Sequence, residues 1–289
     1  MRAPLALSQL AGLPQLAELL RPGFLLVLGL AGIVTLLLYA ERPGLSRRTV
    51  VATVPWMIAA AALSIVGGGG AYPVRVRPAV SGPGAYLTVY AIGCLTWFGL
   101  LQFGRSSQGE RDRVPALIAS MGLGLTFVVL TALFVDAGGI TGGQLFWLAV
   151  APIASGAVAG VVLLLLGLWY PEAAAYTGAV GGLVVFGHAF SAIATAVAVV
   201  SGPGGHTSVS WAVLNVMAAA GLENLLGFDQ QLLWAWGYVW VKLIFALLFV
   251  VAMTAYTRSH PSRGNLLLGA VGAVGVIGGV NALLAMVVA

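Results

Sequence analysis

The chain has 289 residues, of which 60% are hydrophobic and only 7% are charged. A soluble domain carries roughly 25% charged residues, so this chain cannot cover a folded globule with polar surface. The composition excludes a soluble enzyme, a disordered chain and a nucleic-acid-binding domain, and it predicts a multi-pass protein of the cell membrane. The net charge of +5 comes from arginines in short polar segments, which is typical of an orientation signal rather than of a nucleic-acid surface.

Residues 1–22 predict a short interfacial helix that leads into the membrane, because leucines recur on one helical face among prolines and charges. Beyond it, eight stretches have about the 20 mostly apolar residues that a membrane helix needs. These stretches are 23–40, 50–68, 84–103, 115–135, 145–169, 174–200, 231–256 and 265–288. Backbone groups in lipid must be satisfied within each segment, so the expected fold is an all-α bundle of eight transmembrane helices in a single membrane domain, 23–289.

The segment 211–230 has a different character from the eight stretches. Apolar residues recur in it every three to four positions, but Asn215, Glu223 and Asp229 interrupt them. It is too polar for a confident span. The pattern predicts an amphipathic helix that lies at the membrane interface or dips into the bilayer.

Arginines are distributed unevenly between the two ends of the predicted bundle. Loops after the odd-numbered spans hold eight arginines, and the N-terminal segment and the other loops hold four. The eight are Arg42, Arg47, Arg48, Arg105, Arg111, Arg113, Arg258 and Arg263. Because cytoplasmic loops are enriched in Lys and Arg, this bias predicts that both termini lie outside the cell.

Some short sequences recur in the two halves of the chain. Tyr39-Ala40-Glu41 ends the first predicted span and Tyr170-Pro171-Glu172 ends the fifth, and Ser-Gly-Pro-Gly occurs at 81–84 and at 201–204. These matches suggest a 4+4 internal repeat of two parallel four-helix halves. The alternative is coincidence among glycines and prolines.

Glycines in the predicted spans are spaced for close helix packing. Small residues allow helix backbones to approach each other in lipid, and the alternative is a thin wall beside a ligand or a partner subunit. We therefore expect these faces to pack within the chain, or to mediate a homo-oligomer or the binding of a partner membrane subunit. The glycines are the pair Gly156 and Gly160, the pair Gly178 and Gly182, and one face of the last span with Gly272, Gly275 and Gly279.

The sixth predicted span carries a polar stripe. His188, Ser191 and Thr195 are spaced i, i+3 and i+7, so they lie on one side of a helix. One interpretation is interhelical hydrogen bonding alone. The functional interpretation is a site that orients a ligand or handles a proton, because imidazole titrates near neutral pH. In either case we expect the stripe to face other helices and not lipid.

Lys242 is the only lysine and the only formal charge inside a predicted span. Trp234 and Tyr238 precede it by two helical turns and one turn, on the same side. A charged lysine at the bilayer centre costs roughly 3 kcal/mol on insertion scales. We therefore expect its amine to face the bundle interior, near the His188 stripe or the segment 211–230. The alternative is that Lys242 snorkels to an interface and anchors the helix.

The sequence contains no catalytic or cofactor-binding motif that we identify. The single cysteine, Cys94, and three scattered histidines supply no metal-ligand set. We expect neither a metal nor a cofactor, and membrane lipids as the surrounding partners.

Several runs occur in a recognisable order: Thr53 to Leu63, Gly82 to Thr88, Phe186 to Ala196, Trp240 to Leu243, Leu266 to Gly269, and Gly278 to Asn281. In this order they resemble the archaeal membrane protein family known as domain of unknown function number sixty-three. The resemblance implies an archaeal source and a polytopic membrane fold, but the family has no established activity to carry over. Its members typically have His-Ala-Leu-Asp-Gly in the sixth helix, where this chain has Ser191 at the Asp position. A family function based on that carboxylate would be lost or changed here.

Three classes of function fit the sequence. The favoured one is binding or transport of a small or amphipathic molecule within the helix bundle, because transporters place polar groups at mid-membrane. The second is a non-catalytic structural or assembly subunit of a membrane complex, which the glycine faces favour. The third is an intramembrane lipid-modifying enzyme, for which only His188 and Lys242 could serve as acid–base groups.

Overall fold

The computed structural model describes residues 21–68, 72–103, 108–201 and 230–288, which form helices and no strand. Most of the segment 1–22 and of the segment 211–230 lies outside these ranges. The interfacial and amphipathic helices expected there, together with Glu223 and Asp229, therefore stay predictions.

The eight predicted spans are confirmed, each within a few residues of its expected bounds. Eight segments of the described ranges are long and apolar enough to cross a membrane, so the chain is a multi-pass helical membrane protein. The second span is made of two pieces, α4 and α5, and the short helix α6 (Arg77–Val80) precedes the third. The bounds are α3 Pro22–Glu41, α4 Arg47–Ala52, α5 Val54–Gly68, α7 Gly82–Phe103, α8 Gln108–Asp136, α9 Gly142–Trp169, α10 Pro171–Ser201, α13 Gln230–Ser259 and α14 Pro261–Val288.

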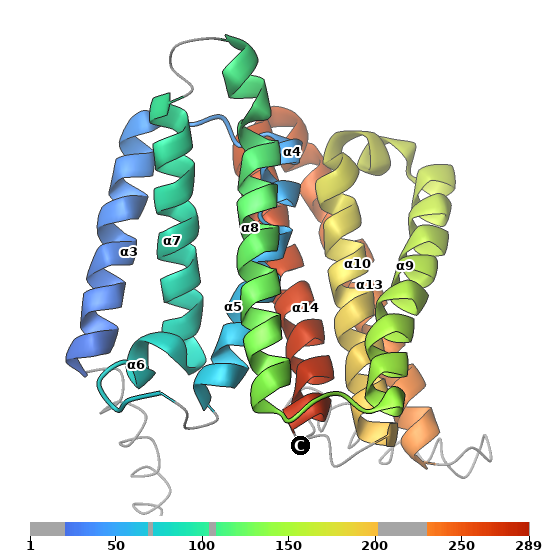
Figure 1. Ribbon diagram of the computed structural model, residues 1–289. Coiled ribbons are helices and arrows are strands. Elements are labelled where there is room, and N and C mark those ends of the chain that lie inside the picture. The colour runs from blue at the N-terminus through green and yellow to red at the C-terminus, as the bar shows by residue number, and fades with distance from the viewer. Residues whose placement is uncertain (1–20, 69–71, 104–107, 202–229, 289) are drawn as a thin grey trace, which may run out of the picture.

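Successive spans run in alternating directions (Figure 1). The start of α3 and the end of α14 lie at one end of the bundle, together with α6 and the connection between α8 and α9. The connections from α3 to α4, from α9 to α10 and from α13 to α14 lie at the opposite end. We call the latter the arginine-rich end, because it carries Arg42, Arg47, Arg48, Arg113, Arg258 and Arg263.

The helices form two groups that meet along α14. In the N-terminal group α5 packs against α7 and α8, and α3 packs against α7; in the C-terminal group α10 packs against α9, α13 and α14. The larger part of the contact between the groups is made by α14 against α5. In each group the second span, α5 or α10, contacts most of the other helices. The first spans differ, because α9 packs on the second span of its group whereas α3 packs on the third span, α7. The 4+4 repeat therefore remains a prediction.

Side-chain hydrogen bonds to backbone carbonyls join α5 to α8. The indole N–H of buried Trp56 donates to the carbonyl of Ile118 at 2.9 Å, and Thr126 Oγ1 donates to the carbonyl of Pro55 at 2.6 Å. Gly122 provides the space for this indole, because a Cβ there would lie 2.6 Å from the ring nitrogen. The only donor of the buried Trp56 side chain is thus hydrogen-bonded within the protein.

The most extensive helix contact among the described residues is between α10 and α14, and glycines allow its close approach. A Cβ placed at Gly187 would lie 2.7 Å from the carbonyl oxygen of Gly272, and one placed at Gly275 would overlap the backbone of Gly187 and His188. Gly279 similarly faces the ring of Phe190. The glycine face of the last span is therefore used for packing within the chain, as expected.

The two GxxxG pairs behave differently from that expectation. Gly156 and Gly160 have no atom near the position of an added Cβ, so they lie on the outer side of α9. Gly182 approaches Leu163 of α9. Gly178 is not a packing glycine: its φ of 53° and ψ of −137° break the helix within α10. Only a residue that tolerates positive φ fits there.

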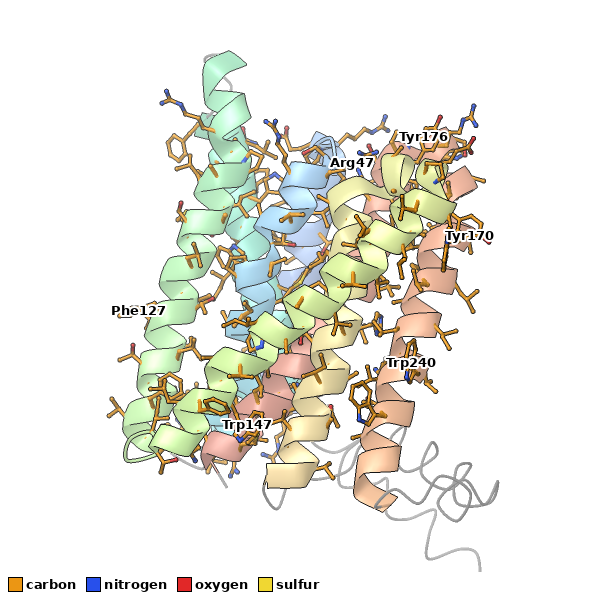
Figure 2. All side chains as sticks on the ribbon, turned by 90° about the vertical axis from the view of Figure 1, so that its right-hand side faces the viewer. Arg47, Phe127, Trp147, Tyr170, Tyr176 and Trp240 are labelled. Carbon is orange, nitrogen blue, oxygen red and sulfur yellow. The ribbon has the colours of Figure 1, made fainter. Side chains whose placement is uncertain are left out.

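Arg47 donates hydrogen bonds to backbone carbonyls at the break in α10. Its guanidinium Nη2 donates to the carbonyls of Ala175 at 2.9 Å and Tyr176 at 2.6 Å, and it lies beside Gly178. Arg258 of α13 stacks over the Tyr176 ring, with 5.2 Å between guanidinium carbon and centroid. Figure 2 shows Arg47 and Tyr176 together at the arginine-rich end. Arg47 therefore joins the two groups of helices by capping a helix end.

Replacing Gly275 by alanine tests the glycine contact. We expect the added methyl group to destabilise the protein by about 1–3 kcal/mol, because it overlaps backbone that cannot move aside. The measurement is thermal unfolding of the purified protein in mild detergent. Gly156→Ala is the matched control, since the same substitution there meets open space. Equal midpoints for the two variants would show that α10 and α14 are not in close contact.

Replacing Arg47 by alanine tests the capped break. We expect a loss of about 1.5 kcal/mol, because hydrogen bonds from a charged donor to two carbonyls are removed. Arg48→Ala is the control, because it removes the same charge from the exposed neighbouring position. A drop in unfolding temperature of the same size in both variants would point to net charge and not to the Ala175 and Tyr176 carbonyls.

Candidate functional site

The polar stripe of the sixth span faces the inside of the bundle. His188 is 3% exposed, Ser191 5% and Thr195 3%, so the expectation that these side chains avoid lipid is met. Thr195 Oγ1 donates to the backbone carbonyl of Ser191 at 2.7 Å, as hydroxyls in membrane helices commonly do. A Cβ at Gly278 of α14 would lie 3.0 Å from Ser191 Oγ, so Ser191 is next to α14.

His188 is buried, and no described residue is its hydrogen-bond partner. Both Nδ1 and Nε2 are removed from the protein surface, and neither has a partner among the residues that the structure describes. The ring packs edge-on against Phe245 of α13, with 5.2 Å between the centroids. Buried polar atoms in native proteins nearly always have partners, so each exception calls for an explanation such as a ligand, a water or a catalytic role.

Lys242 lies close to this histidine. Its Nζ is 5.5 Å from the centroid of the Tyr238 ring, and Tyr238 is only 2% exposed, so the amine turns toward the inner side of α13. Phe245, three residues further along α13, contacts the His188 ring, so Lys242 lies within about one helical turn of this contact. The side chain of Trp234, the third aromatic or basic residue predicted on this face, lies outside the described residues.

The antiparallel register of α10 and α13 explains how the polar stripe of α10 comes to lie beside Tyr238 and Lys242 of α13. Three contacts fix it: Tyr176 with Arg258, Gly181 with Val250, and His188 with Phe245. Moving three or four residues further along α10 corresponds to moving as far back along α13. Ser191 is therefore level with Lys242, and Thr195 with Tyr238. We call His188, Ser191, Thr195, Tyr238 and Lys242 the α10–α13 site.

The site adjoins an apolar outer surface. Around Lys242, which is itself partly exposed, large apolar side chains of α13 are exposed, from 47% for Val241 to 65% for Leu248. Phe245 is 49% exposed, yet its ring also touches His188. Trp240 lies on the same helix (Figure 2). A single aromatic side chain thus reaches from the lipid-facing surface to the buried imidazole.

A second polar cluster joins the two groups of helices toward the end of the bundle opposite the arginine-rich end. Asn281 Nδ2 of α14 donates to Tyr86 Oη of α7 at 2.8 Å, and Tyr86 Oη lies 3.2 Å from Ser64 Oγ of α5. The Ser64 hydroxyl donates to the carbonyl of Ala61, so Tyr86 must donate to Ser64. Asn281 Oδ1 then has no partner in the part of the chain that the structure describes.

Sequence reasoning missed several residues that the structure brings to these places. Phe245 is one of many apolar residues in its span, and nothing in the sequence marks its contact with His188. Asn281 could have been noticed as a lone amide in an apolar helix, but its partner Tyr86 is 195 residues away. Among the described residues, no three His, Cys, Asp or Glu side chains gather closely enough to hold a metal ion.

The fold defines this chain as a polytopic helical membrane protein. No protein-family model, no curated protein and no solved structure matches it. The resemblance to the archaeal family therefore stays a prediction, and the function is argued from the site alone.

Proposed function

We propose that this protein binds or transports a small amphipathic molecule within its helix bundle, at the α10–α13 site. The observation that carries the proposal is the His188 imidazole, which is buried and has no hydrogen-bond partner for either ring nitrogen among the described residues. Leaving a buried polar group unsatisfied costs about 1–3 kcal/mol. A bound molecule that supplies a hydrogen-bond partner would offset this cost, and an interior kept only for packing would be better served by an apolar side chain.

The surroundings of the site favour an amphipathic molecule. Ser191, Lys242 and His188 can contact a polar group, whereas Phe245 and the exposed residues beside it offer apolar contact. A molecule with a polar head and an apolar body matches this division. It would approach from the lipid, because the outer side of α13 is apolar.

A second candidate function is that of a structural subunit. The observation in its favour is the outward-facing pair Gly156 and Gly160 on α9, where no atom of the described residues lies within 4 Å of an added Cβ. Such a pair is suited to close contact with another membrane helix. Association through α9 and binding at the α10–α13 site are compatible, since the two surfaces lie on different helices.

The test is the set of amphiphiles that copurify with the protein in mild detergent, identified and counted by mass spectrometry. We expect the parent chain to retain one amphiphile per chain and His188→Leu to lose it. His260→Leu is the control, because that histidine is exposed at the arginine-rich end and already pairs with Ser259. If His188→Leu copurifies with the same amphiphile in the same amount, the proposed function fails. After delipidation, His188→Leu should be at least as stable as the parent.

We further propose that the arginine-rich end is cytoplasmic and that both termini lie outside, as the distribution of arginines favours. In a Cys94→Ala background, Gly44→Cys should react with a membrane-impermeant thiol reagent only after the membrane is opened. Asp136→Cys, at the opposite end, should react in intact cells. The reverse pattern of labelling would invert the orientation.

A further inference from the structure

We propose that the amphiphile carries an anionic headgroup, a carboxylate or a phosphate, and that Lys242 binds it. This inference rests on the proposed function and specifies its ligand class. The observation behind it is a charge without a counter-charge: the described side chains of Glu41, Asp136 and Glu172 all lie in the first or last turn of their helices. None of the spans that the structure describes therefore offers Lys242 a carboxylate in its interior.

The groups around Lys242 are hydrogen-bond donors. The register places the Ser191 hydroxyl level with Lys242, and His188 lies one turn further along the stripe with its ring nitrogens unpartnered among the described residues. An ammonium can only donate, a hydroxyl can donate, and one nitrogen of a neutral imidazole donates. An ammonium with further donors within about one helical turn of its level suits an acceptor with several oxygens, and charge-assisted hydrogen bonds to an anion are about twice as strong as neutral ones.

Lys242 lies deep within its span. It is twelve residues after Gln230, the first residue of α13, which is about 18 Å along a helix. The hydrocarbon layer is about 30 Å thick, so a headgroup bound there would be held inside the bundle and not at the membrane surface. The apolar tail would run along α13 toward the arginine-rich end, where Phe245 and Phe249 stack with centroids 6.2 Å apart.

The headgroup has two possible sources, a free fatty acid or a phospholipid derivative, and both present oxygens with negative charge. The experiment compares palmitate, hexadecyl phosphate, hexadecanol and hexadecyltrimethylammonium, which differ in headgroup and share an alkyl chain. Each is titrated into the purified full-length protein in a nonionic detergent, and the dissociation constant is obtained from the shift in unfolding temperature. Binding of palmitate alone would indicate a carboxylate ligand, and binding of hexadecyl phosphate would indicate a phosphate headgroup.

Two variants of Lys242 separate the effect of its charge from the effect of its side-chain length. We expect the parent to bind at least one of the two anions tenfold or more tightly than hexadecanol, and hexadecyltrimethylammonium not at all. Lys242→Met should lose this preference and keep the weak binding of hexadecanol, because the side-chain stem remains. Lys242→Arg should retain the preference. Were Lys242→Met to misfold, the discrimination by the parent and by Lys242→Arg would still decide the question.

Failure of this inference differs from failure of the proposed function. If hexadecanol binds the parent as tightly as the anions do, and His188→Leu abolishes the binding of all of them, the ligand is a neutral amphiphile and only the inference is overturned. If no probe gives a shift that depends on His188, both are overturned.

Discussion

The contact of backbone on backbone between α10 and α14 determines most of the architecture. Lipid provides no hydrophobic drive for helices to associate, so close van der Waals packing has to hold them. Gly187 and Gly275 allow the two backbones to approach each other at the crossing. Because α10 also contacts α9 and α13, and α14 also contacts α5, this one crossing orients the two groups of helices. It directs the glycine side of α10 toward α14, which leaves His188 to meet α13.

A cation at the end of the bundle, Arg47, and a cation in its interior, Lys242, have different surroundings. Arg47 lies at the arginine-rich end and neutralises the partial charge of carbonyls that a helix break exposes. Lys242 lies within a span, where desolvation of a charge is expensive, and its described neighbours are a tyrosine ring and donors. The first cation is part of the fold, whereas we propose that the second binds a molecule within the bundle.

Hydropathy alone predicts the eight spans, because length and apolar composition are local properties of each segment. The spacing of His188, Ser191 and Thr195 likewise places them on one side of a helix, because helical periodicity is also a local property. The sequence pattern does not distinguish Gly178 from Gly182. Gly178 breaks the helix, whereas Gly182 packs against α9. The break at Gly178 lies beside Arg47, which is more than a hundred residues away in sequence. The register that sets Ser191 opposite Lys242 likewise depends on contacts between two helices and not on either sequence alone.

α14 follows all the other spans in the sequence, and this order affects how the protein is made. During synthesis the ribosome delivers α3 to α8 and then α9 to α13 into the bilayer before the helix that bridges them exists. In that interval the small-residue side of α10 and the Val50 surface of α4, which α14 later covers at Gly269, are open to lipid. Until α14 is inserted, Arg47 and the break in α10 make the contact between the two groups, and the last helix then extends that contact along the length of the bundle.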